Sequence, residues 1–205
     1  MRVIILKDYA SISSWVAHYI YHKVHNTKCV LGLATGSTPI LVYKNLIDMK
    51  TNFQNVTTFN MDESIGLPPD HHQSYHYFMN YYLFNRTKFY QNNIPNGMAD
   101  DIINECKEYE QKIKDSGGID LFLCGIGTDG HLAFNEPGSS FSSVTRTKTL
   151  TSQTISDNSR FFKYERGPTT AITVGLQTIM DAKEIIIMAN GINKSNAIKY
   201  CVEGP

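Results

Sequence analysis

Strand-length apolar runs alternate with longer amphipathic segments along almost the whole chain, and this alternation limits the fold more than any other feature. The runs with the length and β-branched content of strands are Val3–Leu6, Cys29–Ala34, Val56–Asn60, Asp120–Gly125, Ala171–Val174 and Glu184–Ala189. The segments with helical spacing of apolar residues are Ile12–Val24, Pro39–Met49, Tyr75–Phe84, Asp100–Lys114 and Asn193–Val202. This order predicts an α/β fold of the doubly wound, Rossmann-like type, with a mainly parallel sheet and helices on both faces.

Length and charge limit the function. A chain of 205 residues suits a single domain over 1–205. Lys plus Arg and Asp plus Glu number 19 each, so no long-range basic field attracts nucleic acid or an anionic membrane. The four cysteines form no CxxC pair, and neither a signal-peptide core nor an apolar stretch of roughly 20 residues is visible. We expect a soluble, reduced, cytoplasmic protein without nucleic-acid or membrane partners.

The segment LGLATGSTP is the first polar loop that follows a predicted strand. Ligands of parallel sheets bind at the carboxyl ends of the strands, and Pro39 is a favoured first helical residue. The segment from Thr35 through Gly36 and Ser37 to Thr38 therefore offers backbone amides and hydroxyls to an anion at a helix N-terminus. It is neither a Walker A loop nor a GxGxxG fingerprint, so a merely capped turn is the alternative.

Asp62 and Glu63 end an apolar strand, FNMDE, at the same edge. Adjacent side chains on an extended segment point to opposite sides, so only one of the two is expected to face a site. That carboxylate would be a general base whose pKa is set by partial burial. Helix capping or solvent exposure is the alternative.

The segment GIGTDGHLAFNEP holds three ionisable residues, Asp129, His131 and Glu136, within eight positions. A carboxylate beside an imidazole fixes its tautomer and stabilises its charged form, which suits proton transfer near neutral pH. Glycines in the same segment allow the backbone to approach a ligand closely. One histidine without a thiolate or an HxxxH-type spacing argues against a metal site.

Two further groups of residues are candidates on composition alone. His71, His72 and His76 invite a metal interpretation, but the aromatic residues that follow indicate a helix packed on the core, so we assign these histidines to structure and surface. Arg160 and Lys194 are cations beside apolar residues, and either can bind phosphate, although most such cations are simply solvated.

The chain resembles the glucosamine-6-phosphate deaminase family over nearly its whole length. The resemblance implies a doubly wound α/β fold and the conversion of glucosamine 6-phosphate and water to fructose 6-phosphate and ammonia, without a metal or an organic cofactor. It rests on stretches in family order: LGLATGSTP, TFNMDESIGLP, SYHYFM, IPNGMA, GIGTDGHLAFNEPGSS, TRTKTL, NSRFF, ITVGLQTIMDA and NGINK.

The same resemblance implies roles for individual residues. The enolisation base falls on Asp62, and the ring-opening histidine with its supporting carboxylates falls on His131, Asp129 and Glu136. The contacts to the substrate phosphate fall on Thr35, Gly36, Ser37, Thr38, Arg160 and Lys194.

In some family members an activator, N-acetylglucosamine 6-phosphate, binds between the subunits of a hexamer. The corresponding motif here is Ser139, Ser140, Arg146 and Lys148, which implies an allosteric homo-oligomer. Family members also continue beyond the position of Pro205 with another strand and helix, and we expect the chain to lack these.

Two other functions compete with deamination. A 6-phosphogluconolactonase-like hydrolase needs a water-activating base but no separate base for a C2 proton, so Asp62 together with GTDGHLAFNEP argues against it. A non-catalytic sugar-phosphate-binding module, such as the effector domain of a transcriptional regulator, would accompany a DNA-binding helix-turn-helix, for which no segment has the length or basic charge. A truncated, inactive paralogue is a third possibility. Release of ammonia distinguishes all of these.

Overall fold

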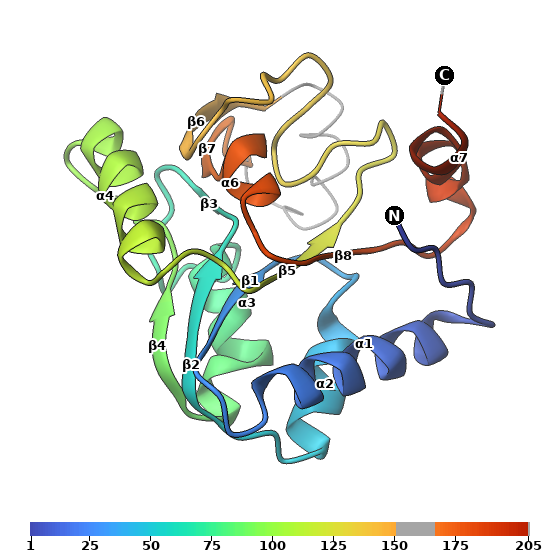
Figure 1. The fold of residues 1–205 in the computed structure, drawn as a ribbon. Helices are drawn as coiled ribbons and strands as arrows, with labels where there is room; N and C mark the ends of the chain where they lie inside the picture. The colour runs from blue at the N-terminus through green and yellow to red at the C-terminus, as the bar shows by residue number, and fades with distance from the viewer. Residues whose placement is uncertain (151–166, 205) are drawn as a thin grey trace.

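A parallel sheet of five strands forms the centre of the protein in a computed structural model, which describes residues 1–150 and 167–204 (Figure 1). Its order is β4 (Phe89–Asn93), β2 (Phe53–Asn60), β1 (Cys29–Leu33), β5 (Leu121–Gly125) and β8 (Ile185–Met188). The chain leaves β1 for β2 on one side and reaches β5 on the other, and both pairings are parallel. The predicted α/β class with a mainly parallel sheet is confirmed.

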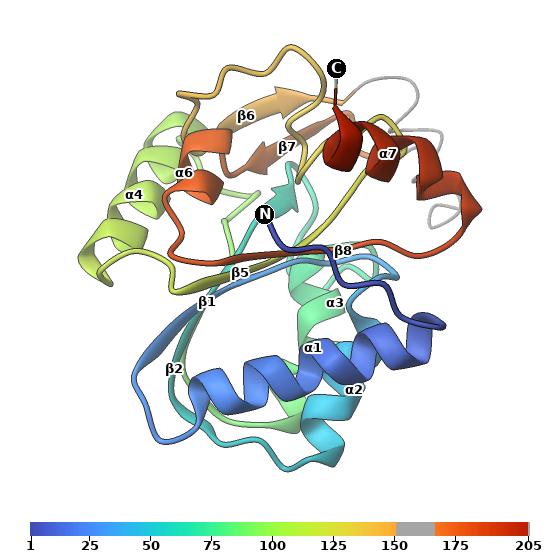
Figure 2. The same cartoon turned by 45° about the vertical axis from the view of Figure 1, so that its right-hand side comes forward.

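Helices lie on both faces of this sheet (Figures 1 and 2). One face carries α1 (Tyr9–Val24), α2 (Ile40–Asp48) and α3 (Tyr75–Tyr82), and the other carries α4 (Ile102–Asp115) and α6 (Leu176–Met180). Side-chain caps define several helix starts, because a side-chain oxygen accepts an otherwise unpaired amide of the first turn. Asp8 accepts from the Ser11 amide at 2.8 Å, and Asp101 accepts from the Asn104 amide at 2.9 Å.

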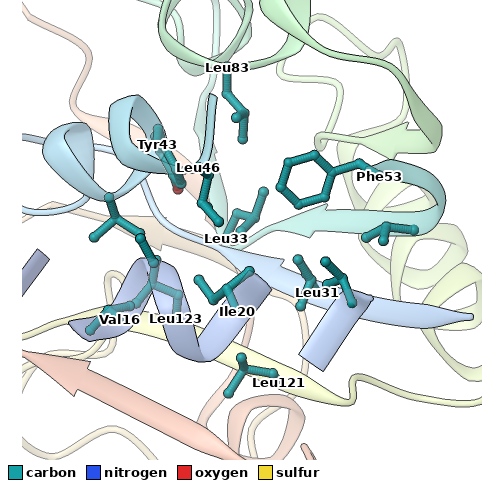
Figure 3. Packing of buried hydrophobic residues seen from close by; sticks show 14 of the residues in the cluster. Val16, Ile20, Leu31, Leu33, Tyr43, Leu46, Phe53, Leu83, Leu121 and Leu123 are labelled. Carbon is teal, nitrogen blue, oxygen red and sulfur yellow. The ribbon is translucent and has the colours of Figure 1, made fainter. Parts of the chain in front are cut away.

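Alternation along the strands divides the core into two halves. Leu31 and Leu33 of β1 and Leu121 and Leu123 of β5 face α1 and α2, where they meet residues such as Ile20 (Figure 3). The alternate residues of β5, Phe122 and Cys124, face α4 and α6. A strand buried on both faces explains why β1 and β5 are nearly continuous apolar runs.

A second, antiparallel sheet covers part of the α4 side, in the order β3 (Asp62–Ser64), β7 (Thr170–Thr173), β6 (Arg146–Thr149). Only Met61 separates β2 from β3, so one extended segment passes from the large sheet into the small one. The predicted strand Ala171–Val174 exists as β7, but its place in the parallel sheet was wrong. It pairs instead between two short strands that the hydrophobic pattern does not reveal.

The remaining elements include further differences from the prediction. Val3–Leu6 forms no strand: Val3 is 51% exposed and Ile5 91%, and both sheets form without this segment. A short apolar run becomes a strand only where a neighbouring strand pairs with it.

The remaining helical elements are short. They are η1 (Phe84–Arg86), η2 (Ile192–Lys194) and α7 (Ser195–Glu203). Within residues 1–150 and 167–204, no helix has the length and apolarity needed to cross a bilayer.

Candidate active site

The carboxyl ends of β1 and β5 form the switch point of the sheet, because the chain continues to opposite faces after these two strands (Figure 1). The turn from Thr35 to Thr38 follows β1, and the GIGTDGHLAFNEP loop follows β5. Asp62 lies just beyond the end of β2, the other neighbour of β1. The polar loops that the sequence singled out therefore meet at one edge.

The turn after β1 is the loop that the sequence predicts to bind an anion. Gly36 has φ 83°, a conformation that other residues rarely adopt, and Pro39 precedes α2 as its N-cap residue. The Tyr9 hydroxyl lies 3.0 Å from the Ser37 carbonyl and 2.9 Å from that of Thr38, and it accepts from the Leu41 amide at 3.2 Å. Tyr9 thus fixes the turn from the start of α1. No sequence signal connects it to a motif almost thirty residues away.

Asp62 is a buried carboxylic acid, with 6% of its surface exposed. Burial, and secondly the charge of neighbouring Glu63, raises the pKa of Asp62 to about 8. A carboxyl with this pKa exchanges a proton near neutral pH, which is the property that a general base requires.

Glu63, its neighbour, has a different role. Its carboxylate accepts the amides of Tyr75 and His76, each at 3.0 Å, and lies 2.9 Å from the His76 ring. It therefore neutralises the unpaired amides and the positive dipole end at the start of α3. The capping alternative that the sequence left open for the acidic pair applies to Glu63.

Tyr75 connects Asp62 with the turn from Thr35 to Thr38. Its side chain hydrogen-bonds to that of Thr35, and burial together with the charges of Asp62 and Glu63 raises the pKa of Tyr75 well above its ordinary value. Its ring also stacks on Phe134 at 6.5 Å between centroids. The sequence indicated Tyr75 only as a helix residue, because an aromatic first turn predicts packing rather than a site.

His131 and Asp129 form the predicted pair. The Asp129 carboxylate lies 2.7 Å from His131 Nδ1 and accepts the His131 amide at 3.2 Å. Burial raises the pKa of Asp129, but the His131 amide and the charge of the ring outweigh it, so that pKa lies below its ordinary value. A methyl group at Gly127 would come within 2.3 Å of the His131 ring, so a glycine is required for the ring to lie where it does.

The second half of this loop is anchored by its backbone and by one amide side chain. The Phe134 amide donates to Thr173 Oγ1 at 3.1 Å. Asn135, 4% exposed, donates to the carbonyls of Leu132 at 3.0 Å and Val174 at 2.8 Å. Glu136 follows as a buried carboxyl. Sequence reasoning missed Asn135, since an asparagine in a loop usually indicates only a turn.

The remaining predicted residues lie around this centre or outside the described part. Lys194, at the end of η2, is half-buried in the segment that follows β8, and Arg160 lies outside the described residues.

The residues of the predicted activator motif lie on and before β6. Arg146 and Lys148 are half-buried on β6. Ser140 is exposed and bonded to the Ser142 hydroxyl at 2.9 Å, whereas the buried Ser139 hydroxyl has no hydrogen-bond partner in the described structure. Over residues 1–150 and 167–204, no three His, Cys, Asp or Glu residues converge as a metal site would require.

A polar turn at the switch point of a parallel sheet, a buried carboxyl of raised pKa and a histidine–aspartate pair are together typical of an enzyme that moves protons on a small substrate. Residues 9–205 match the family model described as glucosamine-6-phosphate isomerases/6-phosphogluconolactonase. The chain belongs to this family.

Individual relatives refine the comparison. A glucosamine-6-phosphate deaminase of Phocaeicola vulgatus is 50% identical over all of this chain and 83% of its own length. The deaminase of Borreliella burgdorferi is 51% identical over 99% of this chain and 81% of its own. Among solved structures, a monomeric glucosamine-6-phosphate deaminase superposes with a TM-score of 0.96 at 40% identity, covering 100% of this chain and 88% of that one.

A 6-phosphogluconolactonase from Thermotoga maritima shares the fold more distantly. Its TM-score is 0.77 at 20% identity, over 98% of this chain and 89% of that one. At that identity the likeness concerns the fold alone.

Proposed function

We propose that the chain is a glucosamine-6-phosphate deaminase, which converts glucosamine 6-phosphate and water to fructose 6-phosphate and ammonia. The observation that carries the proposal is buried Asp62, whose pKa is raised to about 8, at the same sheet edge as the His131–Asp129 pair. Relatives at 50–51% identity carry the deaminase name, which supports this substrate.

The chemistry divides between two groups. His131, held by Asp129 and assisted by Glu136, opens the pyranose by moving the proton of the anomeric hydroxyl to the ring oxygen. Asp62 then takes the C2 proton to give an enolamine and returns it at C1. Water adds to the resulting C2 imine, and its collapse leaves the ketone and ammonia. General acid–base steps of this kind each contribute roughly 10²–10⁴-fold.

The substrate phosphate is assigned to the turn from Thr35 to Thr38, with Lys194 and Arg160 as the cations. Binding this group far from C2 helps to align the reacting carbon with Asp62 and His131. Tyr75, bonded to Thr35 and close to Asp62, would transmit the position of the phosphate to the base. Neither a metal ion nor an organic cofactor takes part in the proposed reaction.

A coupled ammonia assay tests the proposal. Purified protein with glucosamine 6-phosphate should release ammonia and fructose 6-phosphate in equal amounts. Hydrolysis of 6-phosphogluconolactone without ammonia release would identify the lactonase alternative. Sugar-phosphate binding without either reaction would identify a non-catalytic module or an inactive paralogue.

The proposal extends to a cytoplasmic homo-oligomer, up to a hexamer, that acts in amino-sugar catabolism and responds to N-acetylglucosamine 6-phosphate. Light scattering measures the subunit number. A monomer, as in the monomeric deaminase among the structural relatives, would contradict the oligomer. For activation, Lys148→Ala is a cleaner probe than Arg146→Ala, because Arg146 is bonded within the protein to Asn135. Substrate saturation curves that the activator leaves unchanged would contradict this part of the proposal.

A further inference from the structure

Arg146 stands in one row of the small sheet with Asp62. Thr173 on β7 is paired directly with Asp62 on β3 and, on its other side, with Arg146 on β6. Directly opposed residues of an antiparallel sheet point to the same face, and neighbouring strands are about 4.8 Å apart. Asp62, Thr173 and Arg146 therefore line one face at regular intervals.

The loop that carries His131 and Glu136 is bonded to this row at two places. Thr173 accepts the Phe134 amide at 3.1 Å, and Arg146 Nη2 donates to Asn135 Oδ1 at 2.8 Å. Asn135 is the junction, since its side-chain amide also donates to Leu132 in the loop and to Val174 at the end of β7. Val174 in turn donates its amide to the carbonyl of Met61, the residue before Asp62, at 2.8 Å.

The guanidinium of Arg146 is directed to this junction. It is half-buried, burial lowers its pKa, and its Nη1 lies 3.4 Å from the Val144 carbonyl. A charged donor to a neutral amide oxygen makes a stronger hydrogen bond than a neutral donor does. The bond also orients Asn135, because an amide whose oxygen faces Arg146 must present its NH₂ to the two carbonyls.

We propose that Arg146 is a positioning residue for the basal reaction: through Asn135, it holds the His131–Glu136 loop at a fixed distance from Asp62. The inference rests on the proposed deaminase function. It gives Arg146 a role that needs no activator and no neighbouring subunit. Ring opening by His131 and proton transfer by Asp62 then act on one substrate, because Asp62 lies on this row of strands and the His131 loop is bonded to it.

The test compares Arg146→Ala, Arg146→Lys and Asn135→Ala with Thr147→Ala, an exposed neighbour on the same strand. Without activator, Arg146→Ala should lower kcat roughly 10–100-fold with little change in KM. A displacement of a catalytic group by about 1 Å can reduce the rate by up to about 100-fold. Lys can donate one hydrogen bond and should restore part of kcat. The Asn135→Ala/Arg146→Ala double variant should be no slower than the slower single variant. Thr147→Ala should stay within twofold of the unmodified protein.

Hydrogen–deuterium exchange at the Phe134 amide provides a readout that does not depend on catalysis. Arg146→Ala should accelerate this exchange, while amides of β1 remain protected. Unchanged kcat and unchanged Phe134 exchange in Arg146→Ala, or losses that multiply in the double variant, would overturn the inference. If the unmodified protein releases no ammonia, the proposed function fails, and the exchange measurement still decides whether Arg146 positions the loop.

Discussion

At the scale of single residues, Asp62 and Glu63 show how two adjacent, buried carboxyl groups acquire different chemistry. Glu63 accepts the amides that begin α3, whereas burial and the neighbouring charge raise the pKa of Asp62 to about 8. The alternation of side chains along an extended strand is sufficient to separate them. The candidate base is thus defined by its surroundings and not by its residue type.

Asp62→Asn should reduce deamination by at least roughly 10²-fold, because an amide keeps the shape of the side chain but cannot accept the C2 proton. Binding of the sugar phosphate should change little. Incorporation of solvent deuterium at the transferred position should vanish together with ammonia release. Asp48→Asn, at an exposed ion pair on α2, is the control. Turnover within tenfold of the unmodified protein would assign the base to another residue.

The same carboxyl should make stability depend on pH. Its pKa is about 8 in the folded protein and about 3.9 in the unfolded chain, so between these values the folded state holds one more proton. The free energy of unfolding should therefore fall as pH rises from about 4 to 8, by up to about 1.4 kcal/mol per pH unit from this group. Asp62→Asn should remove this slope. Urea titrations of both proteins at several pH values measure it, and parallel pH profiles would contradict the expectation.

At the scale of elements, the loop after β5 depends on a glycine for the orientation of its histidine. Gly127 donates its amide to the His131 carbonyl at 2.8 Å and lies beneath the ring. The Asp129–His131 pair thus requires both a short sequence separation and the absence of a side chain at Gly127.

Gly127→Ala should displace the His131 ring from Asp129, because the added methyl would lie 2.3 Å from Nδ1. Overpacking of this kind costs about 1–3 kcal/mol. In a His131→Ala background the obstructing ring is absent, so the same substitution should cost much less. Denaturant unfolding of the four proteins measures the difference. An equal cost in both backgrounds would mean that the backbone, and not the ring, resists the substitution.

The elements also show what the sequence could and could not predict. The strands β1 and β5 are buried on both faces and were visible as apolar runs. The edge strand β4 is FYQNN, and β3 and β6 are only DES and RTKT, so their pairing and not their hydrophobicity makes them strands. The candidate site divides in the same way. Sequence motifs singled out Asp62 and His131. Tyr9, Tyr75 and Asn135 join the candidate site through contacts between distant parts of the chain, which no local sequence pattern contains.

At the scale of the whole molecule, Glu110 on α4 ties the small sheet to the helices around it. Its buried carboxylate accepts the Thr145 amide at 3.1 Å, the Thr145 hydroxyl at 2.6 Å and the Thr178 hydroxyl at 2.9 Å. One charged group therefore joins α4, the residue that precedes β6, and α6.

Glu110→Ala should lower the free energy of unfolding by about 2–4 kcal/mol, because it leaves buried donors unpaired. Glu108→Ala, exposed on the same helix, should cost no more than about 0.5 kcal/mol. Because Thr145 precedes Arg146, the Glu110 variant should also lose some activity at temperatures where it remains folded. Equal melting of the two variants would show that Glu110 contributes no net stability.

The order of strands in the small sheet has a consequence for biosynthesis. Its middle strand, β7, is the last of the three to be made, and β3 and β6 are joined through it within residues 1–150 and 167–204. A nascent chain whose Asp62 and His131 have already left the ribosome therefore still lacks the strand that joins β3 to the His131 loop. Since β3 and β6 have no partner in this sheet until β7 lies between them, catalytic competence should appear late in folding. In refolding experiments, activity should return more slowly than the helical circular dichroism signal.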